Sequence, residues 1–141
     1  MLRFIWCLPL LIPLLVVWLG EYWLSVHLAR PFRLQEEMVP RILQSVIASI
    51  PFVVAAFYAR RRLRANAARA GVLGAVVALL IGSLLLWGLY YADAVFRREG
   101  GANIGLGILL LFSPIYLPFL MPLGFRIGTT LARKRAVPGA A

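Results

Sequence analysis

The chain is poor in the side chains that most often carry redox, metal or acid–base chemistry. Its 141 residues include one cysteine, one histidine and five Asp or Glu residues. Cys7 has no second cysteine for an intrachain disulfide, and no Cys or His ligand spacing suited to zinc occurs. A lone histidine, His27, supplies neither a two-histidine haem site nor a three-histidine zinc site within one chain. The composition predicts no cofactor, no metal centre and no catalytic residues, and His27 is expected to be a polar residue at a membrane surface.

Apolar residues dominate what remains. They make up 62% of the chain, with a mean hydropathy of +0.88, whereas soluble domains contain about 45–50%. Lipid is therefore the expected solvent. The net charge of +10, from 15 Lys and Arg against five Asp and Glu, would suggest nucleic-acid binding in a soluble protein. In an apolar chain, arginines beside membrane spans instead contact anionic headgroups and set orientation, so membrane lipids and not nucleic acids are the expected partners.

Four apolar segments are long enough to cross a bilayer. The sequence predicts one integral-membrane domain over residues 1–141, with helices at about 4–27, 42–59, 71–92 and 102–125. At a rise of ~1.5 Å per residue, each approaches the ~30 Å thickness of the hydrocarbon core. The first segment begins like a signal peptide, but no small-residue cleavage pattern follows it, so it is expected to be retained. The predicted fold is all-α, a polytopic bundle of four transmembrane helices.

The basic residues divide unequally between the two sides of these segments. With a cytoplasmic N-terminus, ten fall on the cytoplasmic side and five on the other. The ten are Arg3, Arg60, Arg61, Arg62, Arg64, Arg69, Arg126, Arg133, Lys134 and Arg135, and the five are Arg30, Arg33, Arg41, Arg97 and Arg98. Because cytoplasmic loops are enriched in Lys and Arg, the division predicts a bacterial-type inner-membrane protein with both termini in the cytoplasm. Aromatic residues at the outer ends of the first and third segments, such as Trp23 and Tyr91, agree with this threading.

Two acidic residues near the segment ends are candidates for ion coupling. Glu21 and Asp93 fall on the predicted outer side of the first and third segments. A carboxylate in lipid is costly unless it is paired or protonated, and proton-coupled or cation-coupled transporters use such acids. The alternative is an interfacial role, with Glu21 solvated or paired with Arg30 or Arg97, and Asp93 paired with Arg97. The sequence favours the interfacial role and leaves open whether the two acids form a working pair.

The fourth segment carries a proline at every fourth position. Ser113 precedes Pro114, and Pro118 and Pro122 follow. Each proline lacks a backbone donor and clashes with the carbonyl four residues earlier, so the pattern predicts a helix kinked beyond Phe112. The freed carbonyls either line a cavity, as in the broken helices of transporters, or lie in a packed kink. The packed kink is the favoured interpretation.

Small residues recur at intervals of four in the third segment and at the start of the fourth. They are Gly74, Ala78 and Gly82, followed by Gly101 and Gly105. Small residues at this spacing let helix backbones approach closely in lipid. The pattern is compatible with packing inside the bundle, with homodimerisation, or with docking to a larger subunit.

A run of arginines follows the second segment. Arg60, Arg61, Arg62 and Arg64 begin the loop between the second and third segments. Each basic residue near an anionic leaflet contributes about 1 kcal/mol of attraction, so these side chains are candidate contacts for lipid headgroups. An acidic surface on a protein partner is the alternative.

These features predict function only as a class. The favoured hypothesis is a non-enzymatic accessory or structural subunit that packs against itself or against a larger membrane complex. The alternatives are a small proton-coupled or cation-coupled transporter or channel that uses Glu21 or Asp93, and a lipid-modifying membrane enzyme with its acids at the outer rim.

Overall fold

The structure is a computed structural model that describes residues 7–9, 11–12, 14–28, 38–64, 69–96 and 104–136. Within these ranges every element is helical, with single turn residues at Leu28 and Phe112 and no strand. Four stretches are long and apolar enough to cross a membrane: Cys7–His27, Met38–Leu63, Arg69–Phe96 and Ser113–Arg135. The predicted all-α fold with four potential membrane spans is therefore confirmed for the described part of the chain.

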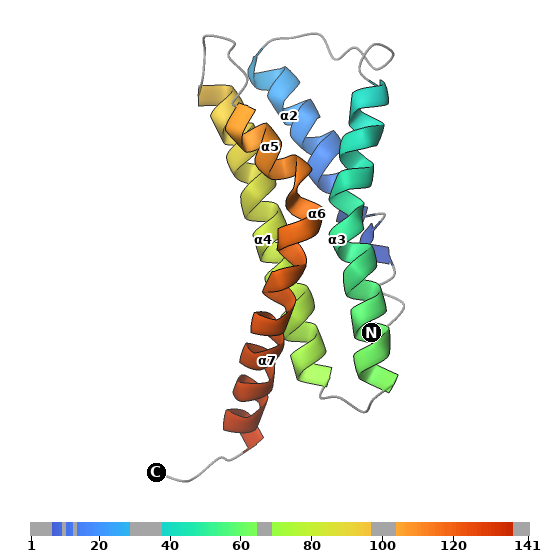
Figure 1. The fold of residues 1–141 in the computed structure, drawn as a ribbon. Helices are drawn as coiled ribbons and strands as arrows, with labels where there is room; N and C mark the ends of the chain where they lie inside the picture. Colours follow the sequence, from blue (N-terminus) through green and yellow to red (C-terminus); the bar gives the residue numbers. More distant parts are fainter. Residues whose placement is uncertain are drawn as a thin grey trace.

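The helices form an elongated bundle (Figure 1). The first span contains a π-helical turn, η1 (Leu14–Trp18), which leads into α2 (Leu19–His27). The two longest helices, α3 (Met38–Arg64) and α4 (Arg69–Phe96), run the length of the bundle. Both extend beyond the apolar ranges 42–59 and 71–92, since arginine and alanine at their ends are good helix formers.

The segment expected over 102–125 is divided into four pieces. They are α5 (Ile104–Leu111), α6 (Ser113–Tyr116), the 3-10 turn η2 (Leu117–Phe119) and α7 (Leu120–Ala136). Thus the last helix continues well past residue 125. Figure 1 shows α5 beside the upper part of α4, and α7 beside its lower part.

The core consists mainly of small or medium side chains on facing helices. Ala48, Phe52, Ala55, Ala56 and Ala59 are buried along one face of α3. The facing side of α4 buries a set with the same helical period: Val72, Ala75, Val76, Leu79, Ser83, Leu86 and Trp87. Large apolar residues are numerous on the outside, as at Phe57 (57% exposed) and Leu85 (62%). An apolar exterior of this kind suits lipid as the surrounding solvent.

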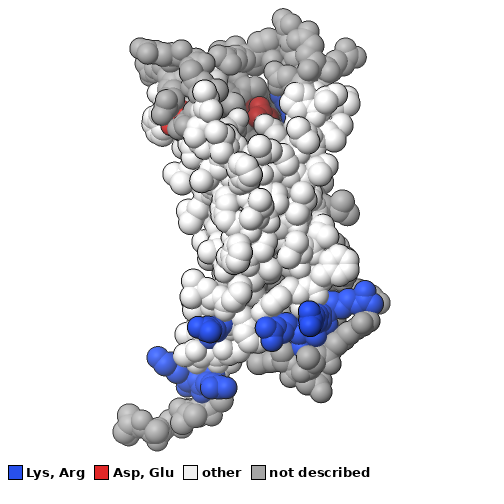
Figure 2. Space-filling model, viewed as in Figure 1, with Lys and Arg blue, Asp and Glu red and all other residues white. Residues whose placement is uncertain are grey.

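The charged residues gather at the two ends of the bundle (Figure 2). The lower end carries exposed cations from α3, α4 and α7, which are Arg60, Arg61, Arg62, Arg69, Arg126, Arg133, Lys134 and Arg135. The two acidic residues of the described ranges, Glu21 and Asp93, lie at the opposite end. Between the ends the visible surface lacks described charged residues over a broad band, as a bilayer core requires.

Candidate functional site

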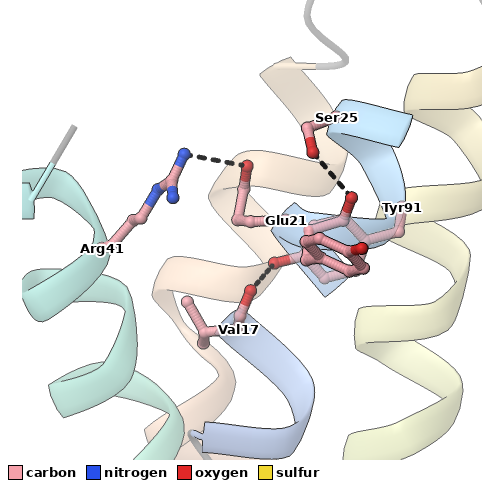
Figure 3. Close-up of polar contacts among 6 residues, drawn as sticks. Val17, Glu21, Ser25, Arg41 and Tyr91 are labelled. Carbon is pink, nitrogen blue, oxygen red and sulfur yellow. Dashed lines mark hydrogen bonds and ion pairs between the residues drawn. The ribbon is translucent and has the colours of Figure 1, made fainter. Parts of the chain in front are cut away.

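A buried ion pair joins the first span to α3 at the acidic end of the bundle (Figure 3). Nη2 of Arg41 lies 3.8 Å from Oε2 of Glu21, and the two side chains are 5% and 17% exposed. A buried cation and a buried anion each lose hydration, and pairing offsets part of that cost. The pair therefore holds α2 and the start of α3 together at a depth where either charge alone would be costly.

Arg41 was expected only among the charges on the outer side, and the structure makes it an interior residue. Arg30 and Arg97, the partners that the sequence suggested for Glu21, lie outside the described residues. The signal for Arg41 was its position: it stands three residues into α3, ahead of Gln44 and Ser45 on the same helical face. A polar stripe of that period on an otherwise apolar helix indicates an interior polar region.

Tyr91 ties α4 to the first span beside this ion pair. Its hydroxyl donates a 3.1 Å hydrogen bond to the backbone carbonyl of Val17. Gly20, one turn after Val17, lies against the Tyr91 ring so closely that a Cβ at residue 20 would overlap it. The ring also stacks on Trp87, with ring centroids 6.1 Å apart, and packs edge-on against Tyr90 at 5.3 Å. Trp87, Tyr90 and Tyr91 thus form an aromatic cluster on α4 at the acidic end of the bundle.

A small cavity opens between α3, α4 and α5 next to this cluster. Its volume is about 230 Å³, and it is lined by Gln44, Ile47, Trp87, Tyr90, Gly107, Leu110 and Leu111. Among the described residues, Oε1 of Gln44 and Nε1 of Trp87 are buried and have no hydrogen-bond partner. A buried amide oxygen and a buried indole N–H in one cavity wall provide an acceptor and a donor for a small polar molecule.

The other sequence candidates at this end lie at the rim. Asp93 is in the last turns of α4 and is partly buried. His27 ends α2, where Nδ1 lies 3.0 Å from the carbonyl of Trp23 and the ring packs against the Trp23 indole. The described residues contain no group of three His, Cys, Asp or Glu side chains that could hold a metal ion.

The proline-rich stretch begins just after α5, whose residues Gly107, Leu110 and Leu111 line the cavity. Pro114 and Pro118 each stand at the start of a new helical piece, where a missing N–H is tolerated. The hydroxyl of Tyr116 donates a 2.9 Å hydrogen bond to the carbonyl of Leu109, in the last turn of α5. Ser113 is fully buried, and its hydroxyl has no hydrogen-bond partner among the described residues. Pro122 lies exposed in the first turn of α7.

The glycines differ in whether a neighbouring helix lies too close to leave room for a side chain. A Cβ at Gly74 would overlap the backbone of Gly124 and Gly128 on α7, and a Cβ at Gly124 would in turn overlap the side chain of Ala78. A Cβ at Gly82 would overlap the side chain of Leu120. By contrast, no described atom lies within 4 Å of a Cβ built at Gly88 or Gly107. Gly105 is exposed in α5, and Gly101 lies outside the described residues.

The arginines after the second span lie at the basic end. Arg60, Arg61 and Arg62 are exposed in the last turns of α3. Arg64 is the final residue of this helix, and the structure describes only its backbone. The guanidinium of Arg62 lies 5.3 Å from the ring centroids of both Tyr58 and Phe125. This cation–π contact fixes one arginine against α7, while Arg60 and Arg61 remain exposed for headgroup contact.

Comparison with known proteins finds no family model, no curated protein and no solved structure that matches this chain. Its function must therefore be inferred from the placement and packing of its own side chains.

Proposed function

We propose that the protein is a non-enzymatic membrane subunit that binds a transmembrane helix of a partner subunit. The proposed binding surface is a groove between the first span and the outer half of α4. The observation that carries the proposal is Gly88, an exposed glycine in the middle of this groove whose missing side chain serves no contact within the bundle.

The groove is long, apolar and edged by aromatic rings. Its volume is about 750 Å³, with α4 contributing Leu84, Trp87, Gly88, Tyr91 and Ala92. The other wall consists of Leu15, Val16, Leu19, Gly20, Tyr22, Trp23 and Val26. Its lining contains no charged residue, so it suits an apolar helix better than a lipid headgroup.

Gly88 distinguishes this groove from other lipid-facing surfaces. Glycine within a helix costs about 1 kcal/mol relative to alanine in water, and membrane helices use it where backbones must approach closely. Gly74 and Gly82 meet that need inside the bundle, against α7 and the residues before it. Within the described part of the chain no atom lies within 4 Å of a Cβ built at Gly88, so the proposed partner helix supplies the close contact.

The proposal places the protein in a bacterial-type inner membrane with both termini in the cytoplasm. The clustering of exposed Lys and Arg at the end where α3 finishes and α4 begins supports this orientation. We also propose that the three prolines bend the fourth span. The support is the interruption at Phe112 and the 3-10 turn η2 that contains Pro118.

The proposed docking surface is tested by photo-crosslinking in membranes. A photoreactive residue at Leu84, which lines the groove, should crosslink to one partner subunit. The same residue at the neighbouring Leu85, which is 62% exposed but outside the groove, should not. Gly88→Leu should abolish the crosslink, and Gly107→Leu, a matched change at the other open glycine, should preserve it. A crosslink to a second copy would assign the groove to homodimerisation, and equal crosslinking at both leucines would refute the docking surface.

The cavity beside Gln44 and Trp87 supports a second candidate function, that of a small transporter. Gln44 and Trp87 carry a buried acceptor and a buried donor that have no partner among the described residues, and both residues line a space of about 230 Å³. This space lies at the same end of the bundle as the Glu21–Arg41 pair. In this function Glu21 or Asp93 is the coupling group. Solute flux in proteoliposomes should then stop in Glu21→Gln or Asp93→Asn while the variant still folds, whereas a docking subunit keeps its partner in both variants.

A further inference from the structure

We propose that a second groove, between α4 and α7, is a specific binding site for an anionic phospholipid of the cytoplasmic leaflet. It lies at the opposite end of α4 from the proposed partner surface; it rests on the proposed orientation of the bundle and not on partner binding. The groove has a volume of about 720 Å³. Its lining is Ala70, Leu73, Gly74, Val77, Ala78 and Ile81 from α4, with Gly124, Ile127, Gly128, Leu131, Ala132 and Arg135 from α7.

The shape of the groove results from the glycine contacts between its two walls. The backbones of Gly74, Gly124 and Gly128 touch at its floor, because none of the three has a side chain to separate the helices. Larger residues such as Leu73 (55% exposed) and Ile127 (51% exposed) stand on its rims. Because the two helix backbones lie close together at the floor and large side chains stand on both sides, the groove is a narrow apolar channel. A flexible acyl chain fills such a channel better than a rigid helix does.

The length of the groove matches one leaflet. From Ala70 to Ile81 the groove follows α4 over twelve residues, and the eleven steps between them span about 17 Å at the α-helical rise. Half of the ~30 Å hydrocarbon core is about 15 Å. The groove therefore accommodates an acyl chain of one leaflet and ends near the membrane midplane.

Basic residues at one end of the groove favour a lipid with an anionic headgroup. Arg135 closes the basic end of the groove, and Arg69 precedes its first α4 residue, Ala70. Arg133 and Lys134 share the last turn of α7, and all four cations are exposed. The described acids, Glu21 and Asp93, lie at the far end of the bundle. A basic cluster between helices, above an acyl-chain channel, is complementary to a lipid phosphate with net negative charge and offers less to a zwitterionic headgroup.

Native mass spectrometry of the purified full-length chain tests the site. Added phosphatidylglycerol should be retained in preference to phosphatidylcholine. Arg135→Gln should weaken retention about five-fold, the effect of one cation at the membrane surface. Arg126→Gln, an equal charge change at an exposed α7 residue that does not line the groove, should leave it intact. Val77→Trp should fill the channel and reduce retention, and Leu85→Trp, on a face of α4 outside the groove, should not.

Three outcomes would overturn the site: equal retention of both lipids, equal loss in Arg126→Gln and Arg135→Gln, or no effect of Val77→Trp. Gly88→Leu should leave lipid retention unchanged. Loss of lipid with an intact partner crosslink, or the reverse, therefore separates the two surfaces.

Discussion

The Tyr91 hydroxyl and the Val17 carbonyl, 74 residues apart in sequence, are joined by a buried 3.1 Å hydrogen bond. Val17 belongs to the π-helical turn η1, and Tyr91 to the last third of α4. The bond therefore connects the first span directly to the longest helix, beside the Glu21–Arg41 pair that connects it to α3 (Figure 3). Two polar contacts thus hold the first span against its neighbours.

Removal of the Tyr91 hydroxyl should loosen the first span without emptying the core. Tyr91→Phe keeps the ring stack on Trp87 and loses the hydrogen bond, which in a membrane interior contributes about 0.6 kcal/mol on average. The free energy of unfolding in mixed detergent micelles measures the loss. Tyr90→Phe, on the same turn of α4, is the control, since its described contacts are made by its ring. An equal loss in both variants would contradict this role of the Tyr91 hydroxyl.

The Glu21–Arg41 pair should behave as a coupled unit. Loss of one partner leaves a poorly hydrated charge, a change that costs on the order of 3 kcal/mol at buried sites. We expect Arg41→Met and Glu21→Gln each to lower the unfolding free energy, and the double variant to be more stable than the sum of the two losses predicts. A double-mutant cycle measures this coupling. Strictly additive losses would show that the two side chains do not interact in the folded protein.

The two kinds of glycine on α4 should differ sharply in tolerance. Gly74→Ala places a methyl group against the α7 backbone, and overpacking of this kind costs about 1–3 kcal/mol. Gly88→Ala meets open space and should leave the melting temperature in detergent unchanged or slightly raised. Thermal unfolding of the two purified variants compares them directly. A destabilised Gly88→Ala would mean that Gly88 is needed by the bundle itself.

The basic end should face the cytoplasm. In a Cys7→Ser background, His27→Cys at the acidic end should react with a membrane-impermeant thiol reagent in intact cells. Lys134→Cys should react only after the membrane is permeabilised. Neutralisation of Arg60, Arg61, Arg62 and Arg69 to glutamine removes the charge bias and should produce a mixed orientation. Labelling of Lys134→Cys in intact cells would reverse the proposed topology.

The 3-10 turn η2 should depend on Pro118. Pro118→Ala restores a backbone donor, so we expect the turn at 117–119 to become α-helical and to change the direction of α5 relative to α7. Spin labels at Ile108 and Ile127, both exposed, report that change as a shifted distance distribution. Pro122→Ala lies in the first turn of α7 and should leave the distance unchanged. If the distance between the two spin labels does not change in Pro118→Ala, this proline does not cause the bend.

The sequence predicts the helical architecture well because three of the four apolar ranges, 42–59, 71–92 and 102–125, contain no charged residue. The ranges 42–59 and 71–92 identify α3 and α4, and the structure extends both helices into polar ends. The division of the last segment was predicted only as a departure from a straight helix beyond Phe112. The positions of α5, α6, η2 and α7 depend on tertiary contacts, such as the Tyr116–Leu109 hydrogen bond, that local spacing does not encode.

The polar interior was less accessible to sequence reasoning. Arg41 follows a proline at the edge of an apolar segment, a pattern typical of interfacial residues. Its one sequence signal of an interior position is the polar face that it shares with Gln44 and Ser45, and the structure shows the burial through the ion pair with Glu21. Gln44 and Trp87 lie more than 40 residues apart, and nothing in their local sequence indicates that they line one cavity. Gly124 and Gly128 were also missed, although their spacing of four on α7 matches that of Gly74 and Ala78 on α4.

The widened turn at Leu14–Trp18 adds about one residue to the winding of the first span. One residue corresponds to about 100° of rotation around a helix axis, so everything after this turn faces a different direction than ordinary α-helical winding would give. In this register Glu21 meets Arg41. We expect a single deletion between Leu14 and Trp18 to rotate the carboxylate away from Arg41, so the number of residues in this turn should matter more to the ion pair than their identities.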